Sequence, residues 1–128
     1  MDKKPRIVAV DDEEDFVATL KDYFALRGYE IKTASKAVMG IELINNEKPD
    51  VVILDLKMPG ISGDEVLGLL KSKQPNTKVI FVSAFDDGGK TKARLLGLGA
   101  VAFLDKPLHS LKELEEVINK AFSGSKLE

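Results

Sequence analysis

The chain has 128 residues, 44% of them hydrophobic and 31% charged, with a formal net charge of -2. This length suits a single domain, and the longest apolar run falls far short of the ~20 residues that a membrane span requires. The absence of cysteine excludes disulfides and thiolate metal sites, and the charge gives no basic field for nucleic acid. With no apolar signal segment at the start, we expect a cytoplasmic protein that binds neither membrane nor nucleic acid through this domain.

Short apolar runs alternate with longer segments of helical periodicity, which is the pattern of βα units that form a parallel sheet. The second predicted strand alternates polar and apolar residues, as an edge strand does. The third is wholly apolar, as expected for a central strand with helices on both faces. We therefore predict a doubly wound α/β fold with five βα units, whose strands cover residues 6–10, 29–33, 51–54, 78–82 and 101–104.

The helices are predicted with different clarity. The segments from Phe16 to Arg27 and from Leu111 to Phe122 each carry one apolar stripe at spacings of three and four residues. Another helix follows Asp55, and its start is marked by Ser62-Gly63-Asp64-Glu65, in which Ser62 and Glu65 have the pattern of a capping box. Glycines bracket and weaken the segment 86–99, where we expect a short helix and local mobility.

Polar residues follow four of the predicted strands. Asp11 and Asp12 follow the first, Asp55 the third, Ser83 the fourth and Lys106 the fifth. Ligands of open parallel sheets collect beyond the carboxyl ends of the strands, so these residues should share one rim. Converging carboxylates repel one another unless a hard cation such as Mg²⁺ joins them. Asp55 could then accept a phosphoryl group, with its charge neutralised by the metal, Lys106 and Ser83.

Each of these residues also has a plainer interpretation. An aspartate pair before a helix is commonly a cap, Asp55 could be a turn residue, and Lys106 a solvated charge. A phenylalanine in a strand, such as Phe103, is most often plain core. The joint occurrence of the polar residues at strand ends favours a site. We interpret His109, the only histidine, as a surface residue and not as a phosphoacceptor.

The order and spacing of four segments resemble the receiver domains of two-component response regulators. These segments are Val10-Asp11-Asp12-Glu13, Leu54-Asp55-Leu56-Lys57-Met58-Pro59-Gly60, Val82-Ser83-Ala84 and Lys106-Pro107. The resemblance covers roughly residues 5–122 and implies a flavodoxin-like strand order 2-1-3-4-5. It places a receiver domain over residues 6–122, an N-terminal tail over 1–5, and a linker start or expression remnant over 123–128.

The resemblance further implies that Asp55 is phosphorylated by a sensor histidine kinase, a phosphotransfer protein or a small phosphodonor. Asp12 and Asp55 would bind Mg²⁺ directly, and Mn²⁺ could substitute. Asp11 would act mainly through water, and the main-chain carbonyl of Lys57 would complete the protein ligands. The Lys106-Pro107 bond is expected to be cis.

A conformational switch is implied by the same resemblance. Ser83 would move toward the phosphoryl group, and the ring of Phe103 would change rotamer with it. The change should appear on the face formed by the fourth helix, fifth strand and fifth helix, where a homodimer is possible. Two positions tune phosphoryl lifetime in the family: we expect Phe85 to shield the acyl phosphate, and Lys57 to pair with the phosphoryl group or the site carboxylates.

Other functions fit the residues less well. A haloacid-dehalogenase-type phosphatase would carry a second aspartate two residues after its nucleophile, but position 57 is lysine and Asp55 follows the third strand. A dinucleotide-binding domain would need a Gly-rich turn where Asp11-Asp12-Glu13-Glu14 stands. A phosphorylation-independent interaction module is the third alternative. We expect a switch and not an enzyme, its chemistry limited to phosphoryl transfer to Asp55 and autodephosphorylation.

Overall fold

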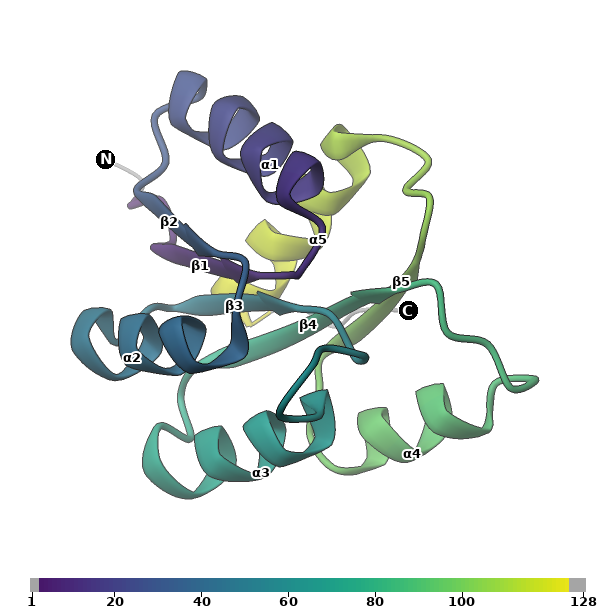
Figure 1. Ribbon diagram of the computed structural model, residues 1–128. Helices are drawn as coiled ribbons and strands as arrows, with labels where there is room; N and C mark the ends of the chain where they lie inside the picture. Colours follow the sequence, from purple (N-terminus) through teal and green to yellow (C-terminus); the bar gives the residue numbers. More distant parts are fainter. Residues whose placement is uncertain (1–2, 125–128) are drawn as a thin grey trace.

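Strand and helix alternate from end to end in the computed structural model, which describes residues 3–124 (Figure 1). Five strands and five helices appear in the predicted order. Their bounds are β1 Ile7–Val10, α1 Glu14–Leu26, β2 Ile31–Ala34, α2 Ala37–Glu47, β3 Val51–Leu54, α3 Gly63–Lys73, β4 Lys78–Ser83, α4 Lys90–Gly97, β5 Ala102–Asp105 and α5 Leu111–Ser123.

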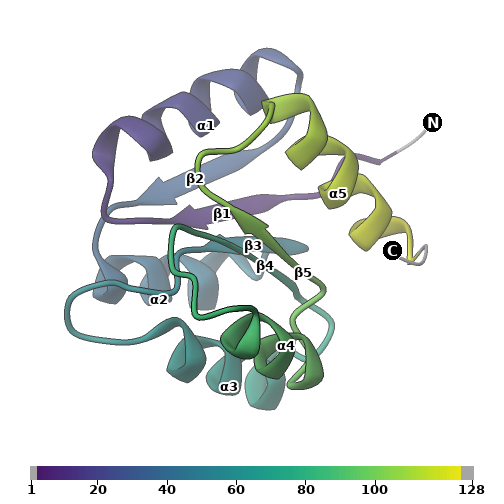
Figure 2. The ribbon, with the colours of Figure 1, turned by 90° about the vertical axis from the view of Figure 1, so that its right-hand side faces the viewer.

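All five strands run parallel in the order β2-β1-β3-β4-β5, which confirms the predicted doubly wound, flavodoxin-like fold. Helices α1 and α5 cover one face of the sheet, and α2, α3 and α4 cover the other (Figures 1 and 2). The chain winds outward in one direction from β1 to β2 and in the other from β3 to β5. The carboxyl ends of β1 and β3 therefore lie side by side at the point where the winding reverses.

The sheet separates two apolar layers. On the side of α1 and α5, Leu20 and Phe24 pack with Leu114 and Ile118, all of them fully buried. On the other side, residues such as Phe81 of β4 fill the space beneath α3 and α4. Every residue of β3 is buried, because a central parallel strand has helices over both faces. This burial holds the strand end before Asp55 in place.

Several predicted boundaries were wrong by one or two residues. The second strand was expected from Tyr29, but β2 begins at Ile31, because the Tyr29 N–H donates 2.9 Å to the Phe24 carbonyl and closes the end of α1. The ladder of β5 ends at Asp105, one residue beyond the expected end. Helix α5 includes Ser123, which was assigned to a linker. Of the other residues of the expected tail and linker, 1–2 and 125–128 lie outside the described part.

Local signals at two helices are confirmed. Ser62 caps α3 by accepting from the Glu65 N–H, and the Glu65 side chain accepts in return from the Ser62 N–H. Helix α4 has only 8 residues and follows two glycines with positive φ; its one buried residue is Leu95. The expected mobility around α4 stays a prediction. None of the helices within residues 3–124 combines the length and apolarity needed to cross a membrane.

Candidate phosphoryl-acceptor site

The register of the central strands brings two acidic residues together. Val10 pairs with Leu54 in the ladder, so Asp11 and Asp55 leave the sheet from neighbouring strands. The Asp55 N–H donates to the Val10 carbonyl at 3.1 Å. Asp11 and Asp55 are 2% and 7% exposed, whereas the adjacent Asp12 is exposed. Carboxylate oxygens of these three aspartates lie within 4.8 Å of one another.

Lys106 reaches this acidic group from the end of β5. Its Nζ lies 2.7 Å from Asp11 Oδ2 and 3.7 Å from Asp55 Oδ2, and it also pairs with Glu13 Oε1. The side chain is only 12% exposed. The bond from Lys106 to Pro107 is cis, as the resemblance implied. The loop after β5 thus directs one ammonium group at several carboxylates.

The charges of the site are incompletely balanced. Burial raises the pKa of Asp11, and the neighbouring Asp55 raises it further, although Lys106 and the Glu13 N–H oppose this. Burial alone would lower the pKa of Lys106, but its contacts with Asp11 and Glu13 outweigh burial and raise it. Asp11 Oδ2 is buried and accepts no well-aligned hydrogen bond. Three carboxylates lie close together and only Asp11 and Asp55 of them contact Lys106, so this donor set suits a hard divalent cation.

Ser83 and Phe103 lie on the neighbouring strands β4 and β5, and both side chains are buried. Ser83 ends β4 with 1% exposure, and its Oγ accepts the Phe85 N–H at 3.2 Å. The Phe103 ring is buried and stacks on Phe81, with 6.1 Å between the ring centroids. Phe103 therefore occupies an inward position in this structure. Its predicted role as a switch remains a prediction.

Lys57 and Phe85 contact each other beside the site. The Lys57 ammonium lies 4.6 Å from the centroid of the Phe85 ring, which is half-buried. Within the described part of the chain, no ion pair joins Lys57 to the site carboxylates, and its expected pairing with the phosphoryl group or with these carboxylates stays a prediction. Its main-chain N–H instead donates to Asp55 Oδ1 at 3.4 Å. The aromatic face offers the ammonium a partner that needs no desolvation of a second charge.

The sequence reasoning missed two neighbours of Lys106. Glu13 was noted only as part of the acidic motif and Phe16 only as a residue of an apolar helical stripe. In the structure Glu13 pairs with Lys106, and Lys106 Nζ lies 4.7 Å from the centroid of the Phe16 ring. Their position near the start of the helix that follows the first strand was the only signal available.

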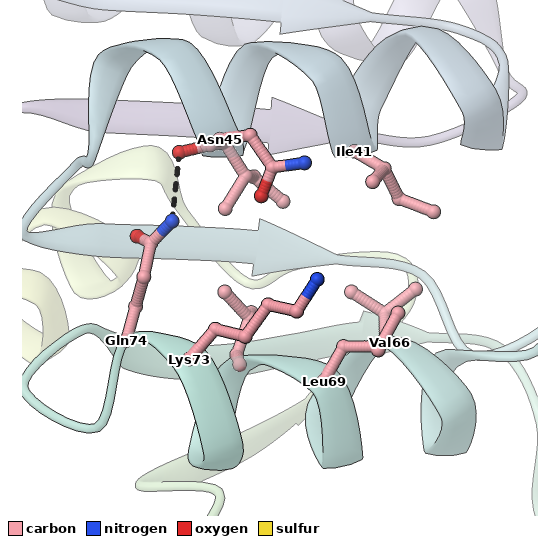
Figure 3. Close-up of a pocket in the computed structure, with 8 residues that line it drawn as sticks. Ile41, Asn45, Val66, Leu69, Lys73 and Gln74 are labelled. Atoms are coloured by element: carbon pink, nitrogen blue, oxygen red, sulfur yellow. Dashed lines mark hydrogen bonds between the residues drawn. The ribbon is translucent and has the colours of Figure 1, made fainter.

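The cavity between α2 and α3 carries none of this chemistry. Its walls are mostly aliphatic, and Gln74 bridges the two helices by donating to the Ile44 carbonyl at 3.2 Å (Figure 3). The cavity lies on the α2–α3 side of the molecule, lined by Ile41, Ile44, Asn45, Val66, Leu69, Leu70, Lys73 and Gln74.

His109 is exposed, as expected. The rim of the sheet is thus the place where reactive groups gather.

Comparison with known proteins agrees with this geometry. A sequence model of the family described as "Response regulator receiver domain" matches residues 7–119. The chain is 29% identical over 115 residues to sporulation initiation phosphotransferase F of Bacillus subtilis, covering 90% of this chain and 91% of that protein. It is 33% identical over 116 residues to the regulatory protein AtoC of Escherichia coli, covering 91% of this chain. It spans only 25% of the length of AtoC.

Solved structures share the fold over almost the whole chain. The signal receiver domain of a putative LuxO repressor protein from Vibrio parahaemolyticus superposes with a TM-score of 0.86 at 28% identity. The match covers 95% of this chain and 92% of that one. The sequence comparison, the shared fold and the arrangement of the rim residues therefore agree with one another.

Proposed function

The chain belongs to the response regulator receiver domain family, and on this basis we propose that it accepts a phosphoryl group on Asp55 and so switches its α4-β5-α5 face. The observation that carries the proposal is the grouping of Asp55 with two further carboxylates and the Lys106 ammonium. A sensor histidine kinase, a phosphotransfer protein or a small phosphodonor would supply the group. The switched face would control an output partner or domain.

In the proposed transfer, a carboxylate oxygen of Asp55 forms a bond to phosphorus. The bond from phosphorus to the donor's nitrogen or oxygen breaks, and its electron pair leaves with the donor. Lys106 neutralises charge on the transferring group, and the Ser83 hydroxyl donates a hydrogen bond to it. Water later cleaves the acyl phosphate and restores Asp55, so the protein releases no product of its own besides phosphate.

The acidic group supports a role for Mg²⁺, with Mn²⁺ able to substitute. Asp12 and Asp55 would hold the ion directly, Asp11 through water, and the Lys57 main-chain carbonyl would complete the protein ligands. The fit rests on three carboxylates within 4.8 Å and on the buried Asp11 oxygen that lacks an aligned hydrogen bond. When bound, the ion would neutralise charge that develops on the phosphoryl oxygens.

Two pairs of residues would govern the response to phosphorylation and its duration. Ser83 and Phe103 would move together as the switch, and the stacking of Phe103 on Phe81 suits a change governed by packing. Phe85, covered by the Lys57 ammonium, would shield the acyl phosphate from water and slow its hydrolysis. Both roles belong to the proposed function and have separate tests: Phe85→Ala should shorten the phosphoryl lifetime, whereas Phe103→Ala should uncouple phosphorylation from the output face.

The proposed output face combines a lightly buried helix, α4, with a well-buried one, α5. Helix α4 buries a single residue, and a groove between α4, β5 and α5 combines apolar side chains with both signs of charge. Its lining suits a second copy of the chain or an output partner, and includes Lys92, Leu96, Phe103, Leu104, Glu113, Glu116, Val117 and Lys120. Family membership also supports a cytoplasmic location.

Intact mass tests the proposal directly. The protein is incubated with Mg²⁺ and acetyl phosphate, with Asp55→Asn as the control and hydroxylamine as the reagent that cleaves acyl phosphates. We expect a phosphate adduct that hydroxylamine removes and that the variant does not form. No adduct, with Mg²⁺ binding confirmed, would overturn the proposal and favour a phosphorylation-independent interaction module.

A further inference from the structure

We propose that Glu13 and Phe16 act as positioning residues for Lys106: Glu13 holds its ammonium beside Asp11 in the unphosphorylated protein, and Phe16 keeps it at the site while it moves to a phosphoryl group on Asp55. The inference rests on the proposed function, because it assigns a resting position to the lysine of that site. Three contacts of Lys106 define this resting position. They are the ion pair to Asp11 at 2.7 Å, the ion pair to Glu13, and the Phe16 ring centroid at 4.7 Å.

The distances show which carboxylates hold the lysine. Asp55 Oδ2 lies 3.7 Å from Lys106 Nζ, a full ångström farther than Asp11 Oδ2. An ammonium group has three donors, and Asp11 and Glu13 engage the two shortest contacts. Glu13 therefore competes with Asp55 for the lysine in the unphosphorylated protein.

Glu13 is free for this contact because it does not cap its helix. It occupies the position before α1, where Ser, Thr, Asp and Asn are preferred since their side chains accept the exposed N–H groups. The Glu13 side chain makes no such hydrogen bond and reaches Lys106 instead. Its carboxylate is 62% exposed, so this ion pair is weak and easily exchanged.

Phe16 holds the lysine in a different way. The ring is half-buried and packs on the apolar layer between the sheet and α1, so its position is fixed. Its face attracts the ammonium without occupying a hydrogen-bond donor. The lysine can therefore keep this contact while its N–H groups exchange Glu13 for a phosphoryl oxygen, whose greater negative charge favours the exchange.

Opposite effects on the rate of phosphorylation are expected from these two roles. Glu13→Gln removes the competing carboxylate, and acetyl phosphate should modify Asp55 roughly two- to fivefold faster. Phe16→Leu removes the aromatic face, and the rate should fall roughly three- to tenfold, whereas Phe16→Tyr keeps the face and should restore it. Glu14→Gln is the matched control: it removes the same charge from the adjacent exposed residue, which is not among the ion-pair partners of Lys106 in the described residues.

A spectroscopic measurement on the unphosphorylated protein is independent of the rates. The ring of Phe16 should shift the NMR signals of the Lys106 ε-methylene protons upfield. Phe16→Leu should move them downfield, and Phe16→Tyr should leave them in place. Unchanged signals in Phe16→Leu would overturn the contact itself.

The outcomes separate this inference from the proposed function. If the wild-type protein forms no adduct at Asp55, the proposed function fails. If it forms the adduct, and Glu13→Gln and Phe16→Leu match the control in rate, only the positioning inference fails. In a Lys106→Met background both substitutions should lose their effects on the rate; persistent effects would show that they act without the lysine and would overturn the inference.

Discussion

Asp11 and Glu115 are both buried carboxylates, but their surroundings differ. Glu115, on α5, accepts hydrogen bonds from the hydroxyls of Tyr23 and Tyr29 at 2.8 Å each, and it forms an ion pair with Arg27 at 2.8 Å. Burial raises the pKa of Glu115, but the hydrogen bonds from Arg27 and the tyrosines outweigh it and leave this pKa lowered. Burial instead leaves the pKa of Asp11 raised, because its few donors do not compensate.

The difference separates a structural carboxylate from a functional one. The Glu115 network joins α5 to the end of α1 and to Tyr29, two residues before β2, and its donors satisfy the charge within the protein. At the rim, Asp11, Glu13 and Asp55 compete for Lys106, Asp12 adds a further carboxylate, and the remaining negative charge is available to a cation or to phosphoryl chemistry. Negative charge that the protein's own donors do not fully compensate thus distinguishes the site from the Glu115 network.

The largest effect on the free energy of unfolding should come from Mg²⁺, which should bind at the rim and not at the Glu115 network. At one hundred times its dissociation constant a ligand adds about 2.7 kcal/mol to the free energy of unfolding. We expect this increment in the wild-type protein and in Glu115→Gln, and its loss in Asp55→Asn. Urea unfolding with and without Mg²⁺ measures it. An equal increment in Asp55→Asn would show that the ion binds elsewhere.

Glu115→Gln should lower the free energy of unfolding by about 2 kcal/mol, because it weakens charge-assisted hydrogen bonds in a buried network. Glu116→Gln is the matched control on the exposed side of the same helix and should stay within about 0.5 kcal/mol. Urea unfolding of the two variants makes the comparison. Similar losses of unfolding free energy in both variants would contradict the structural role assigned to Glu115.

The difference in unfolding free energy between the wild-type protein and Glu115→Gln should depend on pH. Because the folded pKa of Glu115 is depressed, its stabilisation is fully present above the ordinary value of 4.5 and is lost as pH falls through the folded pKa. The gap between wild type and Glu115→Gln should therefore shrink below about pH 4.5. Thermal or urea unfolding across the acid range up to neutral pH is the measurement. A gap that widens toward acid pH would contradict the assigned sign.

Tyr29→Phe should cost about 1 kcal/mol, since the buried Tyr29 hydroxyl both donates to Glu115 and accepts from Asn119 at 2.8 Å. Tyr23→Phe should cost less, because Tyr23 is half-buried and makes one such bond. Urea unfolding of the two variants ranks the donors. The reverse order would mean that the outer hydroxyl matters more to the network.

The smallest effect should come from Asp11→Asn. Loss of the Lys106 ion pair is offset by relief of repulsion from Asp55, so stability should change by less than about 1 kcal/mol. Mg²⁺ affinity, measured by titration calorimetry, should fall in the same variant. A loss as large as that of Glu115→Gln would place Asp11 among the structural carboxylates.

Sequence patterns predicted the fold and the membership of the rim because both depend on local order. Strand ends in a parallel sheet meet at one edge, so Asp11, Asp55, Ser83 and Lys106 converge once the strands are recognised. The patterns did not show that Tyr29 precedes β2 and turns its hydroxyl to Glu115. In sequence, Glu115 beside Glu116 looks like part of an exposed helical face.

The partners of long side chains were decided only by the tertiary structure. Lys57, Lys106 and Glu13 each have several rotamers and several charged or aromatic neighbours, and the outcome depends on which neighbour packing brings within reach. Lys57 lies over Phe85, and Glu13 pairs with Lys106. Apolar periodicity and strand ends are local properties, and from them the sequence by itself determined the parallel sheet and the carboxylates of the rim, while the resemblance to receiver domains implied the strand order. Tertiary packing decided how each charge is compensated, because that depends on residues distant in the chain.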